Sequence, residues 1–235
     1  MFVHRHPYPP FLFEGATKWI VGTLPPPRFS QGILKPGDVD FCYGSRDGQL
    51  WRILDRIFGL KLSFETTPEA VAQRKEFLIR SGIGICDIVD RAERKKIDAT
   101  DLGMENIQLR DMLGLLRQYP RVETLLFTGG NSKNGPEYHF RRLLRSEGIK
   151  LEPVVEKVPR IHRFPLPGTD REITTVSLTA PSGSANRAVG SLSEYKERKA
   201  KNPAYTVMDF RVEQYRRFFS PEPFGKETSE SSRMS

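Results

Sequence analysis

KWIVGTLPPP, residues 18–27, is the stretch that decides the fold. Its apolar residues Trp19, Ile20 and Val21 form a short run typical of a buried strand, and Gly22 ends the run before three consecutive prolines. Proline fixes φ and carries no backbone N–H, so the loop after this strand is stiff and poor in donors. A strand that holds a rigid loop at the edge of a sheet indicates a binding site at that edge.

The size and composition of the chain predict a globular protein. A length of 235 residues suffices for one well-buried core, and 37% hydrophobic with 28% charged residues is an ordinary globular balance. We expect one domain over residues 1–220 and a disordered tail over 221–235, where apolar residues are scarce. No apolar run approaches the roughly 18 residues of a membrane span, and prolines interrupt the N-terminus where a secretion signal needs apolar continuity. We therefore expect a monomer without a membrane partner, located in the cytoplasm and, in a bacterium, at the nucleoid.

Cysteine and histidine are too sparse to predict a metal or cofactor site. Cys42 and Cys86 are too few for a disulfide framework or for a four-cysteine zinc or iron–sulfur site. Of the four histidines only His4 and His6 are close in sequence, and we expect them to lie in a mobile end rather than to bind a metal. The sequence predicts no cofactor.

The charge balance favours a polyanionic partner. Lysine and arginine exceed aspartate and glutamate by eight, and a basic domain of this size is typical of nucleic-acid binding. The alternative is a basic protein whose charge has no specific partner.

Predicted strands and helices alternate along the chain. Strands separated by helices pair in parallel through right-handed crossovers, which predicts an α/β fold. Ligands in such folds bind beyond the carboxyl ends of the strands, so we expect the loops 22–27, 127–134 and 179–187 to lie near one another. Strand patterns occur at 18–24, 83–90, 122–130, 149–155 and 173–180, and helical periodicity occurs at 48–59, 68–82, 106–120, 136–148, 191–200 and 207–219.

Three motifs occur in order at the ends of predicted strands and the starts of predicted helices. They are Gly22–Pro25, then Tyr43-Gly44 through Leu50-Trp51, then Pro181-Ser182 through Ser184-Ala185-Asn186. This combination resembles the uracil-DNA glycosylase superfamily, most closely its hypoxanthine-DNA glycosylase-like branch, and the last loop is also similar to that of the mismatch-specific uracil/thymine glycosylases. The resemblance runs from about residue 19 to about residue 195. It implies a three-layer α/β/α fold around a central, mainly parallel sheet.

The resemblance also implies a pocket for a flipped base and its sugar. A proline-locked loop loses little entropy on binding, and an aromatic ring at Tyr43 would stack on the extruded base, worth roughly 1–3 kcal/mol. One alternative is that the prolines only end the strand, and another is that Tyr43 is an ordinary core residue. We assign Trp51 to the core. The implied pocket residues are Gly22, Thr23, Leu24, Pro25, Tyr43, Gly44 and Gly48.

The last loop is the implied DNA contact. Serine hydroxyls and the free N–H groups of a loop that opens a helix suit phosphate binding, and Arg187 could fill the gap that a flipped base leaves. The alternative is a capping loop in which a serine caps the following helix. The implied DNA-binding residues are Pro181, Ser182, Gly183, Ser184, Asn186 and Arg187, with Arg141 and Arg142 as weaker candidates.

The sequence departs from the family pattern at the catalytic positions. Relatives usually place a water-positioning Asp or Asn where this chain has Leu24, and the hypoxanthine-like branch instead uses an Asn where this chain has Gly48. A carboxylate near the sugar can stabilise developing positive charge and orient water, so Asp47 is the catalytic candidate. Its alternative role is the N-cap of the helix that follows. Asp38 and Asp40 are fallback carboxylates in the same connection.

The resemblance implies a monofunctional DNA glycosylase that excises a deaminated base, uracil or hypoxanthine, from duplex or single-stranded DNA, without metal or covalent lysine intermediate. One alternative is a non-catalytic member of the same fold that binds DNA or a nucleotide. Another is an α/β hydrolase of small nucleosides or esters, which the absence of a Gly-x-Ser-x-Gly elbow disfavours.

Overall fold

The centre of the molecule is a six-stranded, mostly parallel sheet, seen in a computed structural model that describes residues 1–96 and 101–220. The tail predicted for 221–235 lies outside the described residues. The strands are β2 (Lys18–Val21), β3 (Ile83–Ile85), β6 (Thr124–Phe127), β7 (Glu152–Val155), β8 (Arg160–Pro165) and β9 (Glu172–Ser177). Their order is β3-β2-β6-β9-β8-β7; β3, β2, β6 and β9 run parallel, β8 pairs antiparallel with β9, and β7 pairs antiparallel with β8.

Both faces of the sheet are apolar, and the central strands are buried on both sides. Successive side chains of a strand point to opposite faces. Trp19 and Val21 accordingly pack with Phe127 in one apolar cluster, while Ile20 packs with Leu126 in another. A run of apolar residues without alternation, as in residues 19–21, is typical of such a strand.

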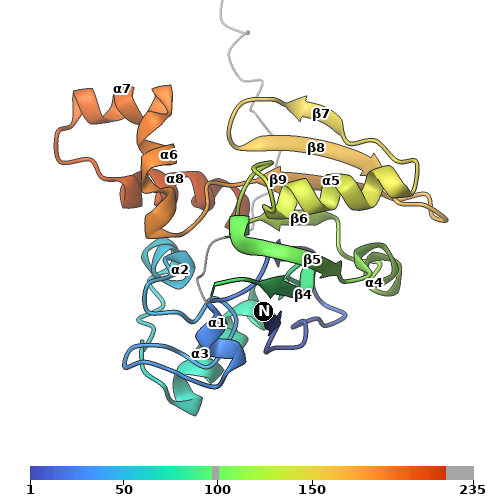
Figure 1. Ribbon diagram of the computed structural model, residues 1–235. Coiled ribbons are helices and arrows are strands. Elements are labelled where there is room, and N and C mark those ends of the chain that lie inside the picture. Colours follow the sequence, from blue (N-terminus) through green and yellow to red (C-terminus); the bar gives the residue numbers. More distant parts are fainter. Residues whose placement is uncertain (97–100, 221–235) are drawn as a thin grey trace, which may run out of the picture.

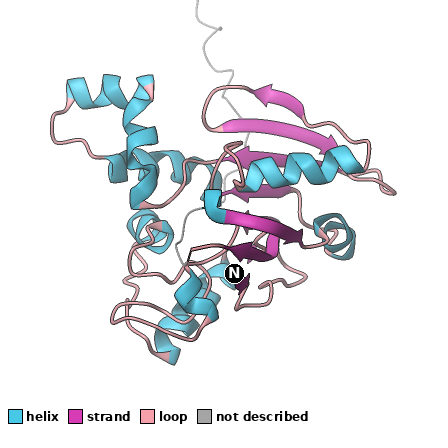
Figure 2. Ribbon diagram, viewed as in Figure 1, coloured by secondary structure: helices cyan, strands magenta, loops and turns pink. Residues whose placement is uncertain are grey.

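Helices cover each face and make the three-layer α/β/α arrangement that the sequence predicts (Figure 2). The Ile20 face packs against α2 (Leu50–Phe58), α3 (Pro68–Arg80) and α8 (Val207–Phe219). The Trp19 face packs against α4 (Met112–Gln118) and α5 (Pro136–Ser146), and Figure 1 shows α5 running alongside β6. No helix in the part of the chain that the structure describes is both long and apolar enough to cross a bilayer.

Three further α-helices of the described residues are short. They are α1 (Pro27–Ser30), α6 (Asn186–Ser191) and α7 (Ser193–Lys201). Figure 1 shows α6 and α7 projecting beside the sheet, next to α8. The prolines after β2 lead directly into α1, whose first residue is Pro27.

A small antiparallel sheet, β1-β4-β5, corrects two expectations. It consists of β1 (Phe2–Arg5), β4 (Val89–Arg94) and β5 (Met104–Leu109). The prediction of a mobile N-terminal end is wrong, because His4 is fully buried in β1 and accepts a hydrogen bond from Arg94 Nε at 2.8 Å. The helix predicted over 106–120 is shorter, because residues up to Leu109 pair with β4 and the Asp111 side chain caps α4 at Gly114 N.

Candidate functional site

A cavity of about 590 Å³ opens at the carboxyl edge of the parallel strands. Its walls include residues 22–23 after β2, 128–132 after β6 and 177–180 at the end of β9, so the three loops meet as the parallel order predicts. The start of β8 and the residues of α6 close the remaining sides. Ligand pockets of about 300–1,000 Å³ hold small molecules, so the cavity has room for one base and its sugar.

The Gly22 loop is fixed by a buried carboxylate. Asp87 Oδ1 accepts hydrogen bonds from Gly22 N and from the Tyr43 hydroxyl, both at 2.6 Å. Asp87 Oδ2 lies 3.0 Å from His6 Nε2. A Cβ on Gly22 would overlap the Tyr43 hydroxyl and lie 2.9 Å from Asp87 Oδ1, so only glycine lets the strand end approach this cluster.

Tyr43 reaches the wall of the cavity through its hydroxyl. Its Oη lies 3.3 Å from Thr128 Oγ1, and Thr128 lines the cavity, whereas Tyr43 itself does not. Tyr43 has a φ of +59°, a left-handed conformation that non-glycine residues rarely adopt. Gly44 lets the turn close, because a Cβ there would overlap the Val39 carbonyl oxygen. Burial, together with Asp87, holds the pKa of Tyr43 well above its usual value, so the hydroxyl is a donor.

Thr23 lines the cavity and holds a second carboxylate. Its Oγ1 donates to Asp101 Oδ1 at 2.8 Å, and Asp101 also lines the cavity. The Asn134 side chain donates to the backbone carbonyls of Asp101, at 2.9 Å, and of Met104, at 3.0 Å, and so fixes the turn that carries Asp101. Burial raises the pKa of the Asp101 carboxyl above its usual value, and the Thr23 hydrogen bond opposes that shift.

Arg160, the first residue of β8, brings a positive charge to the cavity wall. Its Nη2 donates to Glu137 Oε2 at 2.6 Å and its Nε to the same oxygen at 3.2 Å. Glu137 is fully buried and also accepts from Arg141 Nε at 2.8 Å. Burial would raise the pKa of Glu137, but the two arginines outweigh it and the pKa is lowered, so the carboxylate is charged and anchors Arg160.

The loop of residues 181–187 lies against the segment that precedes α2. Gly48 forms a β-bridge with Ser182, and Gln49 N donates to the Pro181 carbonyl at 2.9 Å. The structure thus brings the second and third sequence motifs side by side. The Ser182 hydroxyl caps no helix and lies 3.0 Å from the Ser184 hydroxyl, so the expected alternative of a serine N-cap is wrong.

A buried arginine from α8 holds these two segments together. Arg211 Nη1 donates to Gln49 Oε1 at 2.6 Å and to Asn186 Oδ1 at 2.8 Å, and Nη2 donates to the Ser182 carbonyl at 3.0 Å. All three acceptors are neutral. The guanidinium therefore acts as a clamp on backbone and amide groups, and it sets where residues 182–186 stand beside the cavity.

The remaining predicted pocket and DNA residues do not line the cavity. Leu24 packs partly buried into the apolar cluster of the Trp19 face, and Pro25 is half-buried. Within the last loop Ala185 lines the cavity. Four predicted DNA-binding residues of the same loop are exposed: Gly183, Ser184, Asn186 and Arg187.

The sequence-predicted carboxylates do not line the cavity. The Asp47 side chain is 73% exposed, with Oδ2 3.9 Å from Arg28 Nη2 and Oδ1 4.0 Å from Arg46 Nε. Its alternative role as a helix cap is wrong, because Gln49 precedes the first residue of α2. Asp38 is buried and bonded through both oxygens to Arg28, and Asp40 accepts from the Tyr8 hydroxyl.

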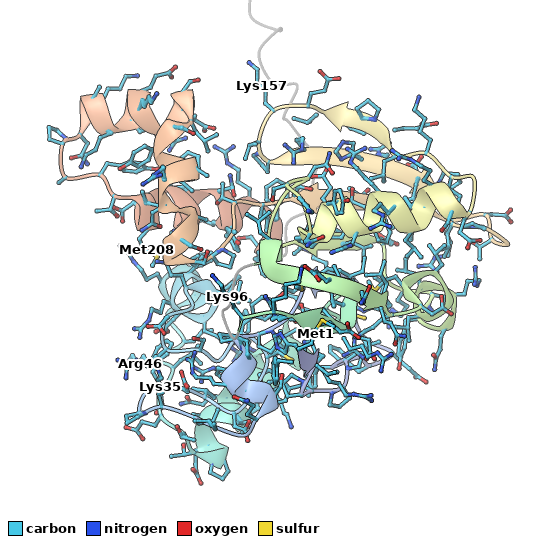
Figure 3. All side chains as sticks on the ribbon, viewed as in Figure 1. Met1, Lys35, Arg46, Lys96, Lys157 and Met208 are labelled. Carbon is cyan, nitrogen blue, oxygen red and sulfur yellow. The ribbon has the colours of Figure 1, made fainter. Side chains whose placement is uncertain are left out.

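The arginines predicted to contact DNA differ in their exposure to solvent. Arg142 on α5 and Arg187 on α6 are exposed, whereas Arg141 is tied to Glu137. Figure 3 shows Arg46 close to Lys35 on the long connection after α1, where Arg46 Nη1 donates to the Pro36 carbonyl at 3.1 Å.

Four side chains at or beside the cavity were not predicted from the sequence. Asp87 was visible as a lone acidic residue inside the apolar run 83–89, a pattern that indicates a buried carboxylate with partners. His6, Asp101 and Arg160 carried no such signal, because their partners lie far away in the sequence: His6 meets Asp87 across 81 positions.

These elements define a class of fold: a three-layer α/β/α protein with a uracil-DNA glycosylase-like sheet and a cavity at its carboxyl edge. A solved structure with this fold is the solution NMR structure of a "putative Uracil DNA glycosylase" from Methanosarcina acetivorans, with a TM-score of 0.51 and 19% sequence identity. The match covers 90% of this chain and 99% of that one. No protein-family model and no curated protein matches the chain. At this identity the likeness establishes the fold.

Proposed function

We propose that the protein is a monofunctional DNA glycosylase, which hydrolyses the N-glycosidic bond of a flipped, deaminated base, uracil or hypoxanthine. The observation that supports this proposal most strongly is the cavity of about 590 Å³ at the carboxyl edge of a sheet of this fold. A glycosylase extrudes its target nucleotide into a pocket and reads the base there. The cavity has the size for one nucleotide, and the loop at Gly22–Thr23 is held rigid by hydrogen bonds before any ligand arrives.

The surface around the cavity supports DNA as the polymer. The chain carries a net charge of +8, and Arg187 and the serine hydroxyls of residues 182–184 are presented beside the cavity mouth. Phosphate contacts of this kind position a nucleic acid without reading its sequence. The choice of base would then lie with the polar groups inside the cavity.

The test is release of free base from oligonucleotides that contain deoxyuridine or deoxyinosine, in duplex and single-stranded form. Ala188 lines the cavity from α6 and is exposed, so Ala188→Trp should block the entrance without disturbing the core. Ala200→Trp, at an exposed position of α7 outside the cavity, is the matched control. We expect wild type and Ala200→Trp to release base at equal rates and Ala188→Trp to be slower by at least tenfold.

Asp47→Asn belongs in the same assay, because Asp47 is the catalytic candidate of the sequence analysis. A carboxylate that acts as general base should cost roughly 10²–10⁴-fold in rate when it is neutralised. Wild-type turnover in this variant would remove Asp47 from the mechanism.

A second candidate function is binding of DNA or a nucleotide without catalysis. Two observations favour it: Leu24 packs into the apolar core, and Gly48 has no side chain, at the two positions where the resembling enzymes place a water-positioning group. Wild-type protein that binds these oligonucleotides but releases no base from any of them would select this function over the first.

A further inference from the structure

We propose that Asp101 is the catalytic carboxylate of this cavity. It would position the attacking water, the role that the resembling enzymes give to an Asp or Asn at the position of Leu24. This inference rests on the proposed glycosylase function and assigns its chemistry to a residue outside the three sequence motifs. Asp101 comes from the connection between β4 and β5, elements of the small sheet rather than of the central one.

The first support is the charge inventory of the cavity. Among its lining residues, all of which belong to the described part of the chain, Asp101 is the only carboxylate and Arg160 the only cation. Cleavage of an N-glycosidic bond develops positive charge on the sugar and negative charge on the leaving base. Preorganised groups of opposite sign in a water-poor site stabilise such a transition state.

The second support is the contact with the first loop. Thr23 is adjacent to Leu24, and the Thr23 hydroxyl binds Asp101 Oδ1 at 2.8 Å. The carboxylate therefore stands beside the loop position that is apolar in this chain. Its other oxygen, Oδ2, makes no hydrogen bond to any residue that the structure describes, so among those residues nothing competes with a water molecule for it.

The third support is that Asp101 is held in place before a substrate binds. Asn134 fixes the backbone of the turn through the carbonyls of Asp101 and Met104, and Thr23 fixes the side chain. Asn134 is buried and adopts a φ of +62°, a left-handed conformation that asparagine tolerates better than most residues. Fixed geometry of this kind is what a group needs if it is to orient a reacting water.

The step balances as a hydrolysis. The C1′–N bond breaks, and its electron pair leaves with the base. A water oxygen bonds to C1′ while its proton passes to Asp101, and the departed base takes up a proton from solvent. The carboxyl then releases its proton, which leaves an abasic site and a free base. Burial raises the pKa of Asp101 above its usual value, which makes the carboxylate a stronger base.

The experiment compares Asp101→Asn with Glu105→Gln. Glu105 lies on the same hairpin, has an exposed side chain that pairs with Lys95 Nζ at 3.0 Å, and does not line the cavity. Three quantities are measured: single-turnover release of the base that wild type excises, affinity for an oligonucleotide with a non-cleavable 2′-fluoro nucleotide at that base, and the melting temperature.

We expect Asp101→Asn to lose roughly 10²–10⁴-fold in rate, with unchanged or tighter binding of the 2′-fluoro oligonucleotide and a melting temperature at or above that of wild type. Glu105→Gln should stay within about twofold of wild type in rate. A merely structural role would instead lower the melting temperature of Asp101→Asn together with its affinity.

The two proposals fail in different ways. Base release by Asp101→Asn within about threefold of wild type would overturn the role of Asp101 and leave the glycosylase function standing. Parallel loss of rate and of oligonucleotide affinity in that variant would also overturn it, since the residue would then act in binding. Wild-type protein that releases no base would overturn both.

Discussion

Tyr43→Phe is the substitution that separates the two roles of this residue. The change removes only the hydroxyl, which donates to Asp87 Oδ1 at 2.6 Å and lies 3.3 Å from Thr128 Oγ1. A hydrogen bond to a carboxylate contributes about 1.5–3 kcal/mol to stability. Asp87 Oδ1 keeps its bond from Gly22 N, so no buried carboxylate oxygen is stranded.

The expected loss of stability is therefore about 1.5–3 kcal/mol, which in a domain of this size lowers the melting temperature by roughly 3–12 °C. Thermal and urea unfolding measure it directly. Tyr138→Phe on α5 is the matched control, because the Tyr138 hydroxyl makes no hydrogen bond to any residue that the structure describes; it should melt with wild type.

DNA affinity tests the ring rather than the hydroxyl. If the ring stacks on the extruded base, Tyr43→Phe should bind DNA as wild type does, and Tyr43→Ala should lose roughly 1–3 kcal/mol, about 5–150-fold. A Tyr43→Phe protein that melts with wild type would refute the reasoning, because it would show that the hydroxyl does not support the Asp87 cluster that fixes the Gly22 loop.

Two further predictions concern charge. DNA binding should weaken steeply as the salt concentration rises, because phosphate contacts release counterions. In a fluorescence-anisotropy titration, Arg187→Gln should reduce the slope of log K against log salt by about one unit. A salt-independent affinity would show that the basic charge does not serve phosphate contacts. The second concerns Asp101, whose pKa in the folded protein is raised by burial and by Asp87 and lowered by Thr23 and Arg94, with Arg160 facing the same cavity. Its contribution to stability is present below the unfolded value near 3.9 and is lost as pH rises through the folded value, so Asp101→Asn should gain most over wild type at pH 7 and least at pH 3.5 in melting curves. A variant less stable than wild type at pH 7 and equal to it at pH 3.5 would contradict this sign.

The parts of the molecule that the sequence predicted are those with a local physical cause. The apolar run before Gly22 predicts a central strand, and the prolines after it predict a rigid loop. The periodicity of residues 50–58 predicts α2, and Pro68 together with the Thr67 cap marks the start of α3. The meeting of three loops at one edge follows from the parallel order of the strands, which any alternation of strands and helices imposes.

The parts that were missed depend on long-range contacts. β1 pairs with β4 across almost ninety positions, so His4 reads as part of a loose end until its partner strand is known. Asp101 and Arg160 enter the cavity because of where their strands are placed, and nothing in their sequence neighbours marks them. Asp47 was chosen because it adjoins Gly48, where the resembling branch has an Asn, whereas the fold places its carboxylate in solvent.

The antiparallel direction of β8 has a consequence for how a ligand is held. The first residue of a reversed strand stands at the edge where its parallel neighbours end, so Arg160 faces the cavity from within the sheet rather than from a loop. A free arginine side chain has about 2 kcal/mol of rotamer entropy to lose, but Glu137 has already immobilised this one. The entropy of this side chain is therefore lost on folding, so an anionic group that binds in the cavity does not have to immobilise the guanidinium.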